Sequence, residues 1–70
     1  LLEREEVREQ VRKGIDGLPE NYRTVIVLRD IEEFNTAETA EMLGLTPGTV
    51  KVRLHRARLT LRSQIGSLFE

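Results

Sequence analysis

Cationic side chains cluster near the end of this chain, where their spacing could support contact with phosphates and bases. No Asp or Glu occurs between Met42 and Phe69, and the basic residues in that interval are Lys51, Arg53, Arg56, Arg58 and Arg62. The first forty-one residues hold eleven acids against six bases, a formal charge of −5, although the whole chain sums to only −1. A dipolar molecule with one basic end is the electrostatic pattern expected of a nucleic-acid-binding surface.

These basic residues fall on one side of a predicted helix. Counting 3.6 residues per turn, the apolar residues of this segment form a single stripe, which we expect to face the core: Val50, Leu54, Ala57 and Leu61. The opposite side carries Gly48, Val52, His55, Arg56, Leu59 and Arg62, with Lys51, Arg53 and Arg58 on its flanks. The pattern predicts an amphipathic helix with its basic side exposed.

The signals before this helix predict a helix-turn-helix over approximately residues 35–62. Asn35 can cap a short helix, with Glu38 completing a capping box, and Gly44 can end that helix in the left-handed conformation. Thr46 then caps the basic helix, and Pro47 suits its first position. The expected apolar face of the short helix is Ala37, Ala40 and Leu43. Two helices joined by so short a turn must cross steeply, which places the second one to enter the DNA major groove.

Two further helices are expected upstream. Residues 1–16 are rich in charge around an apolar seam at helical spacing that continues to Leu18, and they predict an amphipathic first helix; the seam is Val7, Val11, Ile15 and Leu18. Pro19 to about Ile31 is apolar on nearly every side and should be the central, most buried helix, followed by a connection over residues 32–34. The helical pattern decays after Arg62, and residues 67–70 should form a frayed tail. We therefore expect one all-α domain over residues 1–70, a four-helix orthogonal bundle resembling a winged helix without the wing.

Composition excludes most chemistry. The chain has no cysteine and a single histidine, His55, so it offers no metal site of a recognised spacing. No glycine-rich phosphate loop occurs, and Ser63 and Ser67 lack a candidate base, so we expect no enzyme activity, no cofactor and no small-molecule substrate. The longest apolar run, Val25 to Leu28, is too short to span a bilayer, which makes a cytoplasmic protein the default. Since the chain does not begin with Met, we interpret it as part of a longer protein.

Several strings in this sequence resemble region four, the C-terminal domain, of bacterial sigma factors, most closely the extracytoplasmic-function (ECF) group. They are Leu18-Pro19, Arg29-Asp30, the segment 38–45 and the segment 48–58, so that the likeness covers roughly residues 16–62. The resemblance implies a four-helix DNA-binding domain that works in transcription initiation, as part of RNA polymerase holoenzyme. It implies three partners: promoter double-stranded DNA at the minus-thirty-five element, the β-subunit flap of core RNA polymerase, and an inhibitory anti-sigma factor.

The resemblance also implies site residues. The base-contacting positions would be Lys51, Val52, His55 and Arg56, which lie on or beside the outward side of the basic helix in its first turns. For the DNA backbone we select Thr46, Gly48, Thr49, Arg53, Arg58 and Arg62, at the start of the helix and on its flanks. A docking surface for polymerase or the anti-sigma factor would involve Val27, Leu28, Ile31 and Phe34.

The chain departs from the family pattern at a few positions. Glu33 stands where the family usually has Gly, Thr39 where it usually has Ile, and Thr36 near a usual aromatic residue. These positions pack the first helix of the motif, so they bear on local stability. Val52 replaces a common Ser on the DNA-facing side, and His55 occupies a variable position, so the promoter sequence cannot be copied from a relative.

Other functions compatible with the sequence remain open. A helix-turn-helix output domain of a response regulator also carries a TVK string, but it would act as a dimer on paired half-sites. Alternatively, the basic helix could bind an acidic protein partner, such as an anti-sigma factor, without contacting DNA. An RNA-binding domain is disfavoured because the aromatic residues available for stacking are only Tyr22, Phe34 and Phe69.

The charge count predicts weak DNA binding by this chain on its own. If about four phosphates are neutralised, log K should fall with log salt at a slope near −3.6, with non-specific Kd values of roughly 10⁻⁴ to 10⁻⁶ M. Fluorescence anisotropy with a labelled duplex over a salt series measures both quantities. A nanomolar Kd at about 150 mM salt would contradict the prediction, because tethering to a larger assembly would then be unnecessary.

Overall fold

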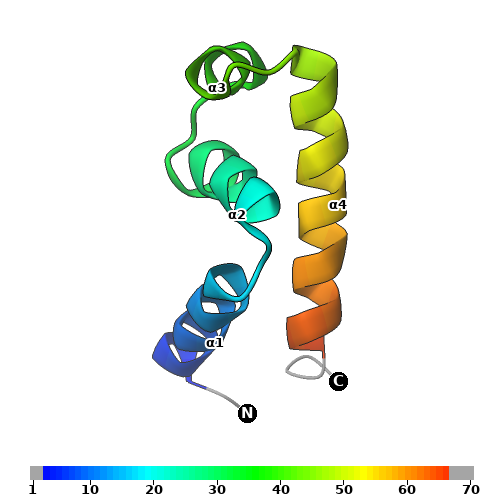
Figure 1. Cartoon of the computed structure of the whole chain (residues 1–70). Coiled ribbons are helices and arrows are strands. Elements are labelled where there is room, and N and C mark those ends of the chain that lie inside the picture. The colour runs from blue at the N-terminus through cyan, green and yellow to red at the C-terminus, as the bar shows by residue number, and fades with distance from the viewer. Residues whose placement is uncertain (1–2, 67–70) are drawn as a thin grey trace.

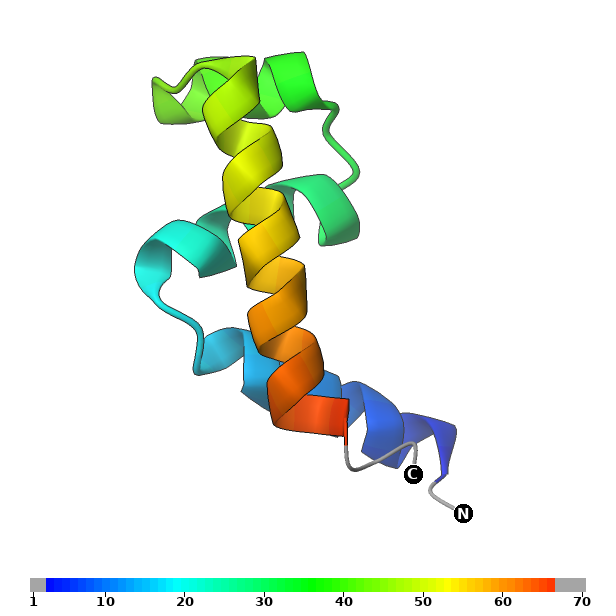
Figure 2. The ribbon, with the colours of Figure 1, turned by 90° about the vertical axis from the view of Figure 1, so that its right-hand side faces the viewer.

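Four helical segments follow one another in the computed structural model, which describes residues 3–66. They are α1 (Arg4–Asp16), α2 (Glu20–Ile26) continued by one π-helical turn η1 (Val27–Ile31), α3 (Thr36–Leu43) and α4 (Pro47–Ile65). Helix α4 forms a long rod, and α1, α2 and α3 lie along one side of it (Figure 1). Turning the molecule shows α4 crossing in front of the others (Figure 2). Residues 3–66 contain no strand, so the expected all-α, four-helix architecture is confirmed.

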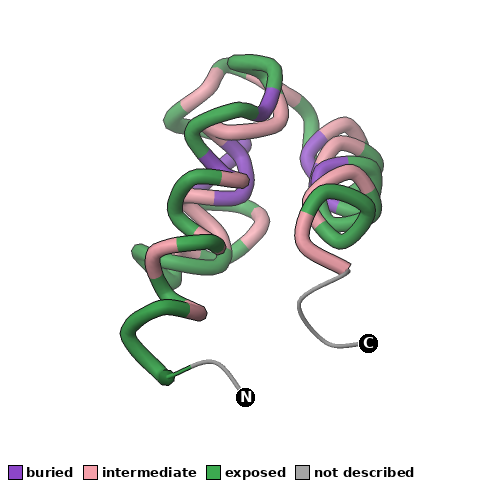
Figure 3. Tube along the Cα trace, turned by 90° about the horizontal axis from the view of Figure 1, so that it is seen from below, coloured by how far each residue is buried: buried purple, intermediate pink, exposed green. Residues whose placement is uncertain are grey.

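The core lies between α2 and α4. Val25 and Ile26 of α2 are 0% and 2% exposed, and Val50 and Ala57 of α4 are both 0% exposed. Buried residues gather on the facing sides of these helices, whereas the far side of α4 is largely exposed (Figure 3). With Leu54 also buried, the predicted apolar stripe of α4 and the predicted central position of the second helix are both confirmed.

The connection between α1 and α2 is fixed by a side chain of α2. The Arg23 guanidinium donates to the carbonyl oxygens of Asp16 and Leu18, at 3.1 and 3.2 Å. These carbonyls lie at the end of α1 and just after it, where helix geometry leaves backbone acceptors without partners. Pro19 is the N-cap of α2, so this helix begins one residue later than we predicted.

The helix-turn-helix signals act as the sequence predicts. The Glu38 amide donates to Asn35 Oδ1 at 2.8 Å, and the Asn35 amide donates to Glu38 Oε1 at 2.9 Å, which completes the capping box. Gly44 ends α3 with a left-handed φ of 66°, a conformation that glycine adopts without steric cost. Thr46 caps α4 by accepting from the Thr49 amide at 3.1 Å. As a result, α3 and α4 cross steeply, and Figure 1 shows α3 end-on beside the upright α4.

Two details of these helices differ from the prediction. Ala40 is buried as expected, but Ala37 is exposed, and the second buried residue of α3 is Thr39, whose hydroxyl has no partner within the described residues. Helix α4 also continues past Arg62, because its last turn packs on α1. The two helices approach each other closely at Gly14 of α1, where an added Cβ would lie only 2.8 Å from Leu61 Cδ1 of α4. The expected start of the first helix at Leu1 and the frayed tail over 67–70 lie outside the described residues.

The turn between α2 and α3 requires an unusual backbone conformation. The Glu32 amide donates to the Val27 carbonyl, as a π-helical turn requires, and the Phe34 amide donates to the Leu28 carbonyl, both at 2.9 Å. Between these two bonds the chain reverses direction at Glu33, whose φ is 62°. A residue with a Cβ pays a steric cost in this region. The glycine that the family resemblance leads us to expect at this position would therefore have a physical reason.

Replacing Glu33 with Gly should stabilise the fold by about 0.5–1 kcal/mol, because glycine removes the left-handed strain and loses part of that gain to its own chain entropy. Urea denaturation followed by circular dichroism measures the change. Glu32→Gly is the matched control, since Glu32 has an ordinary φ of −83° and should lose about 0.5–1 kcal/mol. A destabilised Glu33→Gly variant would contradict the strain argument.

Candidate nucleic-acid interface

One side of α4 is exposed along its first three turns. The four residues predicted to contact bases all lie on this side and are exposed to solvent: Lys51, Val52, His55 and Arg56. Val52 is 49% exposed although it is apolar, while Leu54, two residues later, is 6% exposed on the core side. The rotation of α4 about its axis is therefore the one that the sequence pattern predicted.

The start of α4 forms a depression in the surface beside these residues. Its lining joins predicted backbone-contacting and base-contacting positions, namely Thr46, Gly48, Thr49, Val52, Arg53 and Arg56. The first turn of α4 contains no acid, so the positive end of the helix dipole is not offset there. Two arginines and a helix N-terminus at one depression favour an anion such as a DNA phosphate.

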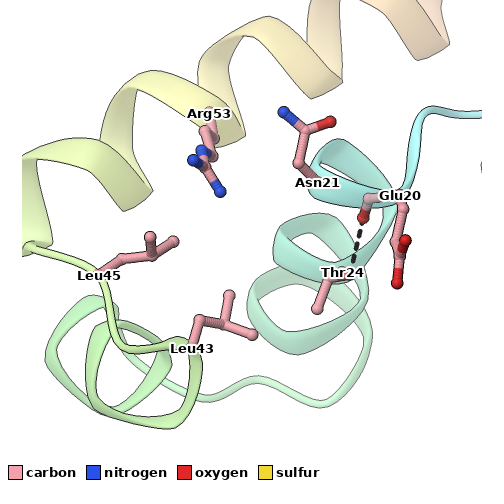
Figure 4. Close-up of a pocket in the computed structure, with 6 residues that line it drawn as sticks. All are labelled: Glu20, Asn21, Thr24, Leu43, Leu45 and Arg53. Atoms are coloured by element: carbon pink, nitrogen blue, oxygen red, sulfur yellow. Dashed lines mark hydrogen bonds between the residues drawn. The ribbon is translucent and has the colours of Figure 1, made fainter.

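Arg53 also borders a second pocket, on the side of α4 that faces α2. Figure 4 shows its side chain reaching from α4 into a space bounded by Asn21 and Thr24 of α2 and by Leu45 of the turn. The side chain is half-buried, and its guanidinium makes no hydrogen bond to another described residue. Its aliphatic part covers apolar surface while the charged end stays near solvent, a common arrangement for arginine. The charge remains available at the edge of the interface.

Arg58 differs from the other cations because it is held by a carboxylate. Its Nε donates to Asp30 Oδ2 at 2.9 Å and its Nη2 donates to Asp30 Oδ1 at 2.5 Å. These hydrogen bonds raise the pKa of the Arg58 guanidinium above its ordinary value. Sequence reasoning placed Arg58 among the backbone contacts and missed this partner, because the two residues are 28 positions apart in the chain and only the tertiary fold brings them together. Arg62 is exposed, as predicted.

An apolar groove lies between α1 and η1, and no residue of α4 lines it. Val27 and Ile31, two of the four predicted docking residues, line it, and Ile31 is 54% exposed. Leu28 and Phe34 are half-buried and are not part of its lining. The other lining residues come from α1, three of them from the predicted apolar seam: Val7, Val11 and Ile15, with Arg8, Arg12 and Asp16 beside them.

Sequence comparison identifies the family of this helix-turn-helix domain. The family model described as "Sigma-70, region 4" matches residues 8–61, which include all of α2, α3 and the exposed side of α4. The chain belongs to the sigma-70 region 4 family. The predicted resemblance to region four of sigma factors is thereby confirmed.

Relatives of this region 4 domain carry sigma-factor names. The chain is 44% identical over 63 residues to the ECF RNA polymerase sigma factor SigW of Bacillus subtilis, an alignment that covers 90% of the chain and 34% of that protein. It is 44% identical over 52 residues to the ECF RNA polymerase sigma factor ShbA of Streptomyces griseus, covering 74% of the chain and 27% of ShbA. It is 40% identical over 58 residues to the ECF RNA polymerase sigma factor SigM of Mycobacterium tuberculosis, covering 83% and 30%. The chain thus spans about a third of the length of the curated relatives that it matches.

The described part of this region 4 domain lacks a metal-binding cluster and a membrane-spanning helix. Residues 3–66 contain no group of three or more His, Asp or Glu side chains arranged to hold a metal ion. None of the helices in that range combines the length and the hydrophobicity that crossing a membrane requires.

Proposed function

We propose that this region 4 domain recognises the minus-thirty-five promoter element, by placing α4 in the major groove, within an ECF-type sigma factor that directs transcription initiation. The observation that carries the proposal is the two-sided character of α4. Its exposed side bears Lys51, Val52, His55 and Arg56, while Val50, Leu54 and Ala57 on the opposite side are buried. The domain would act by binding alone, without catalysis, in the cytoplasm where promoter DNA and polymerase are found.

Each exposed residue offers a different contact to a base edge. The Arg56 guanidinium can donate two parallel hydrogen bonds to guanine O6 and N7, a pairing worth roughly 1–3 kcal/mol of discrimination. The Val52 methyl groups suit contact with a thymine methyl, and Lys51 can donate to a base acceptor or a phosphate. His55 can donate or accept through its ring nitrogens. The depression at the start of α4 would receive a backbone phosphate and so fix the position of the helix along the groove.

The domain would depend on core RNA polymerase for stable promoter binding. Its cations are few and the rest of the chain is acidic, so DNA affinity should be weak unless tethering raises the effective concentration. The apolar groove between α1 and η1 shares no lining residue with the depression at the start of α4, so the two surfaces can serve different partners. We assign this groove to the polymerase β flap, and to an anti-sigma factor that would inhibit by covering it.

The response-regulator, protein-interaction and RNA-binding alternatives receive no support. Neither the family match nor the named relatives point to a response regulator. A domain that presents one exposed helix side can contact DNA as a single copy, and it then needs no paired half-site.

Replacing Arg56 with Ala should relax the promoter preference at one base pair of the minus-thirty-five element. The test is transcription from a randomised promoter library, by core polymerase with the full-length protein carrying either residue. The unchanged protein should enrich a G·C pair that the variant no longer selects, a loss of roughly tenfold to a hundredfold in discrimination. Arg62→Ala is the control, because an exposed cation contacting phosphate should weaken all promoters alike.

Two outcomes would count against this assignment of α4. Enrichment confined to positions away from minus thirty-five would remove the proposed role of the whole helix. A preference unchanged by Arg56→Ala, with transcription intact, would remove the role of Arg56 alone.

Replacing Ile31 with Glu should abolish binding to core polymerase and leave DNA binding by the isolated domain unchanged. The substitution places a charge in the apolar groove, and its desolvation would oppose docking of an apolar partner. Met42→Glu is a matched control, because Met42 is also 54% exposed but lies on α3 outside the groove. Polymerase pull-down and duplex anisotropy measure the two activities; equal polymerase binding by both variants would contradict the docking assignment.

A further inference from the structure

The bond between Asp30 and Arg58 is the ion pair that joins two helical segments within residues 3–66, since the other recorded pair, Arg12 with Glu9, lies within α1. It links η1 to the middle of α4 through two hydrogen bonds from one guanidinium to one carboxylate. A two-point contact between two planar groups fixes orientation as well as distance. The pair therefore fixes the position of the Arg58 guanidinium, two residues beyond Arg56, against the carboxylate of η1.

The position of Arg58 on α4 shows which cationic surface the ion pair interrupts. Seven residues are almost two full helical turns, so Arg58 lies on the same flank as Lys51, and Arg62 follows one turn later. Without Asp30, these three side chains would form a continuous cationic stripe along one edge of the DNA-facing side. The Asp30 carboxylate stands at the centre of that stripe and is itself partly exposed, at 33% of its side chain.

We propose that Asp30 is a specificity-determining residue, which holds Arg58 away from the DNA backbone so that base contacts carry a larger share of the binding. This inference rests on the proposed DNA-binding function of α4. Affinity for arbitrary DNA comes from neutralised phosphates, so each cation removed from the contact set lowers it. Promoter choice depends on the ratio of specific to non-specific binding, and a lower background raises that ratio.

The inference can be tested with the salt dependence of binding to a duplex of random sequence. Asp30→Asn should release Arg58 to one further phosphate, steepen the slope of log K against log salt by about 0.9, and tighten non-specific binding roughly five- to tenfold near 0.1 M salt. Binding to a promoter duplex should tighten less, so that the promoter preference falls. Glu32→Gln is the matched control, because it makes the same charge change two residues away. The Glu32 side chain is exposed and forms no ion pair with another described residue.

Further variants separate release of Arg58 from a general electrostatic or structural effect. In an Arg58→Gln background, Asp30→Asn should change binding no more than Glu32→Gln does. Asp30→Ser, which lacks the amide that could still hydrogen-bond Arg58, should reproduce the steeper slope. Thermal melting followed by circular dichroism identifies the variants that remain folded. The salt slopes are compared among these folded variants.

The outcomes distinguish this inference from the function on which it rests. Two results would overturn the role of Asp30 and leave DNA binding by α4 in place. One is an Asp30→Asn salt slope equal to that of Glu32→Gln. The other is a salt slope that Arg58→Gln alone makes shallower by about 0.9, because Arg58 would then already contact a phosphate in the unchanged chain. Absence of any DNA binding by the unchanged chain would overturn the proposed function, and this inference with it.

Discussion

Burial of one side of α4 against α2 is the constraint on which the rest of the structure depends. Val25 and Ile26 meet Val50, Leu54 and Ala57 across this contact, and all five are at most 6% exposed. Full burial of a branched aliphatic side chain contributes roughly 1.5–3 kcal/mol, so rotating α4 enough to expose this stripe would cost most of the stability of so small a domain. The outward direction of Arg56 and His55 therefore follows from hydrophobic packing on the other side of the helix.

The sequence could predict what local chemistry determines. The Asn35–Glu38 capping box, the left-handed Gly44 and the Thr46 cap each depend on residues within a few positions, and all three formed as expected. Helical periodicity likewise gave the correct buried side of α4, because tertiary packing selects the same side that the pattern marks. The exposed positions of the candidate base contacts followed from that periodicity, whereas their roles on DNA stay predictions.

Features that depend on residues far apart in the chain could not be predicted. The Asp30–Arg58 pair and the groove between α1 and η1 exist only because separate segments pack side by side. Thr39 and Glu33 are positions where the sequence departs from the residues expected by family resemblance, but only the structure shows what each departure does to stability. Thr39 buries a hydroxyl without a partner among the described residues, and Glu33 adopts a left-handed φ of 62°. Both features cost stability, which suits a domain that would be held in place by a larger assembly.

We predict that DNA contacts the outward side of α4 and leaves α1 and its groove free. Amide chemical shifts of the chain, titrated with a duplex containing the selected minus-thirty-five element, test this most directly. The expected changes lie over residues 46–62, largest near Val52, His55 and Arg56, with α1 unaffected. Changes confined to α1 and η1, with the amides of 46–62 unmoved, would contradict the claim that α4 is the DNA-contacting helix.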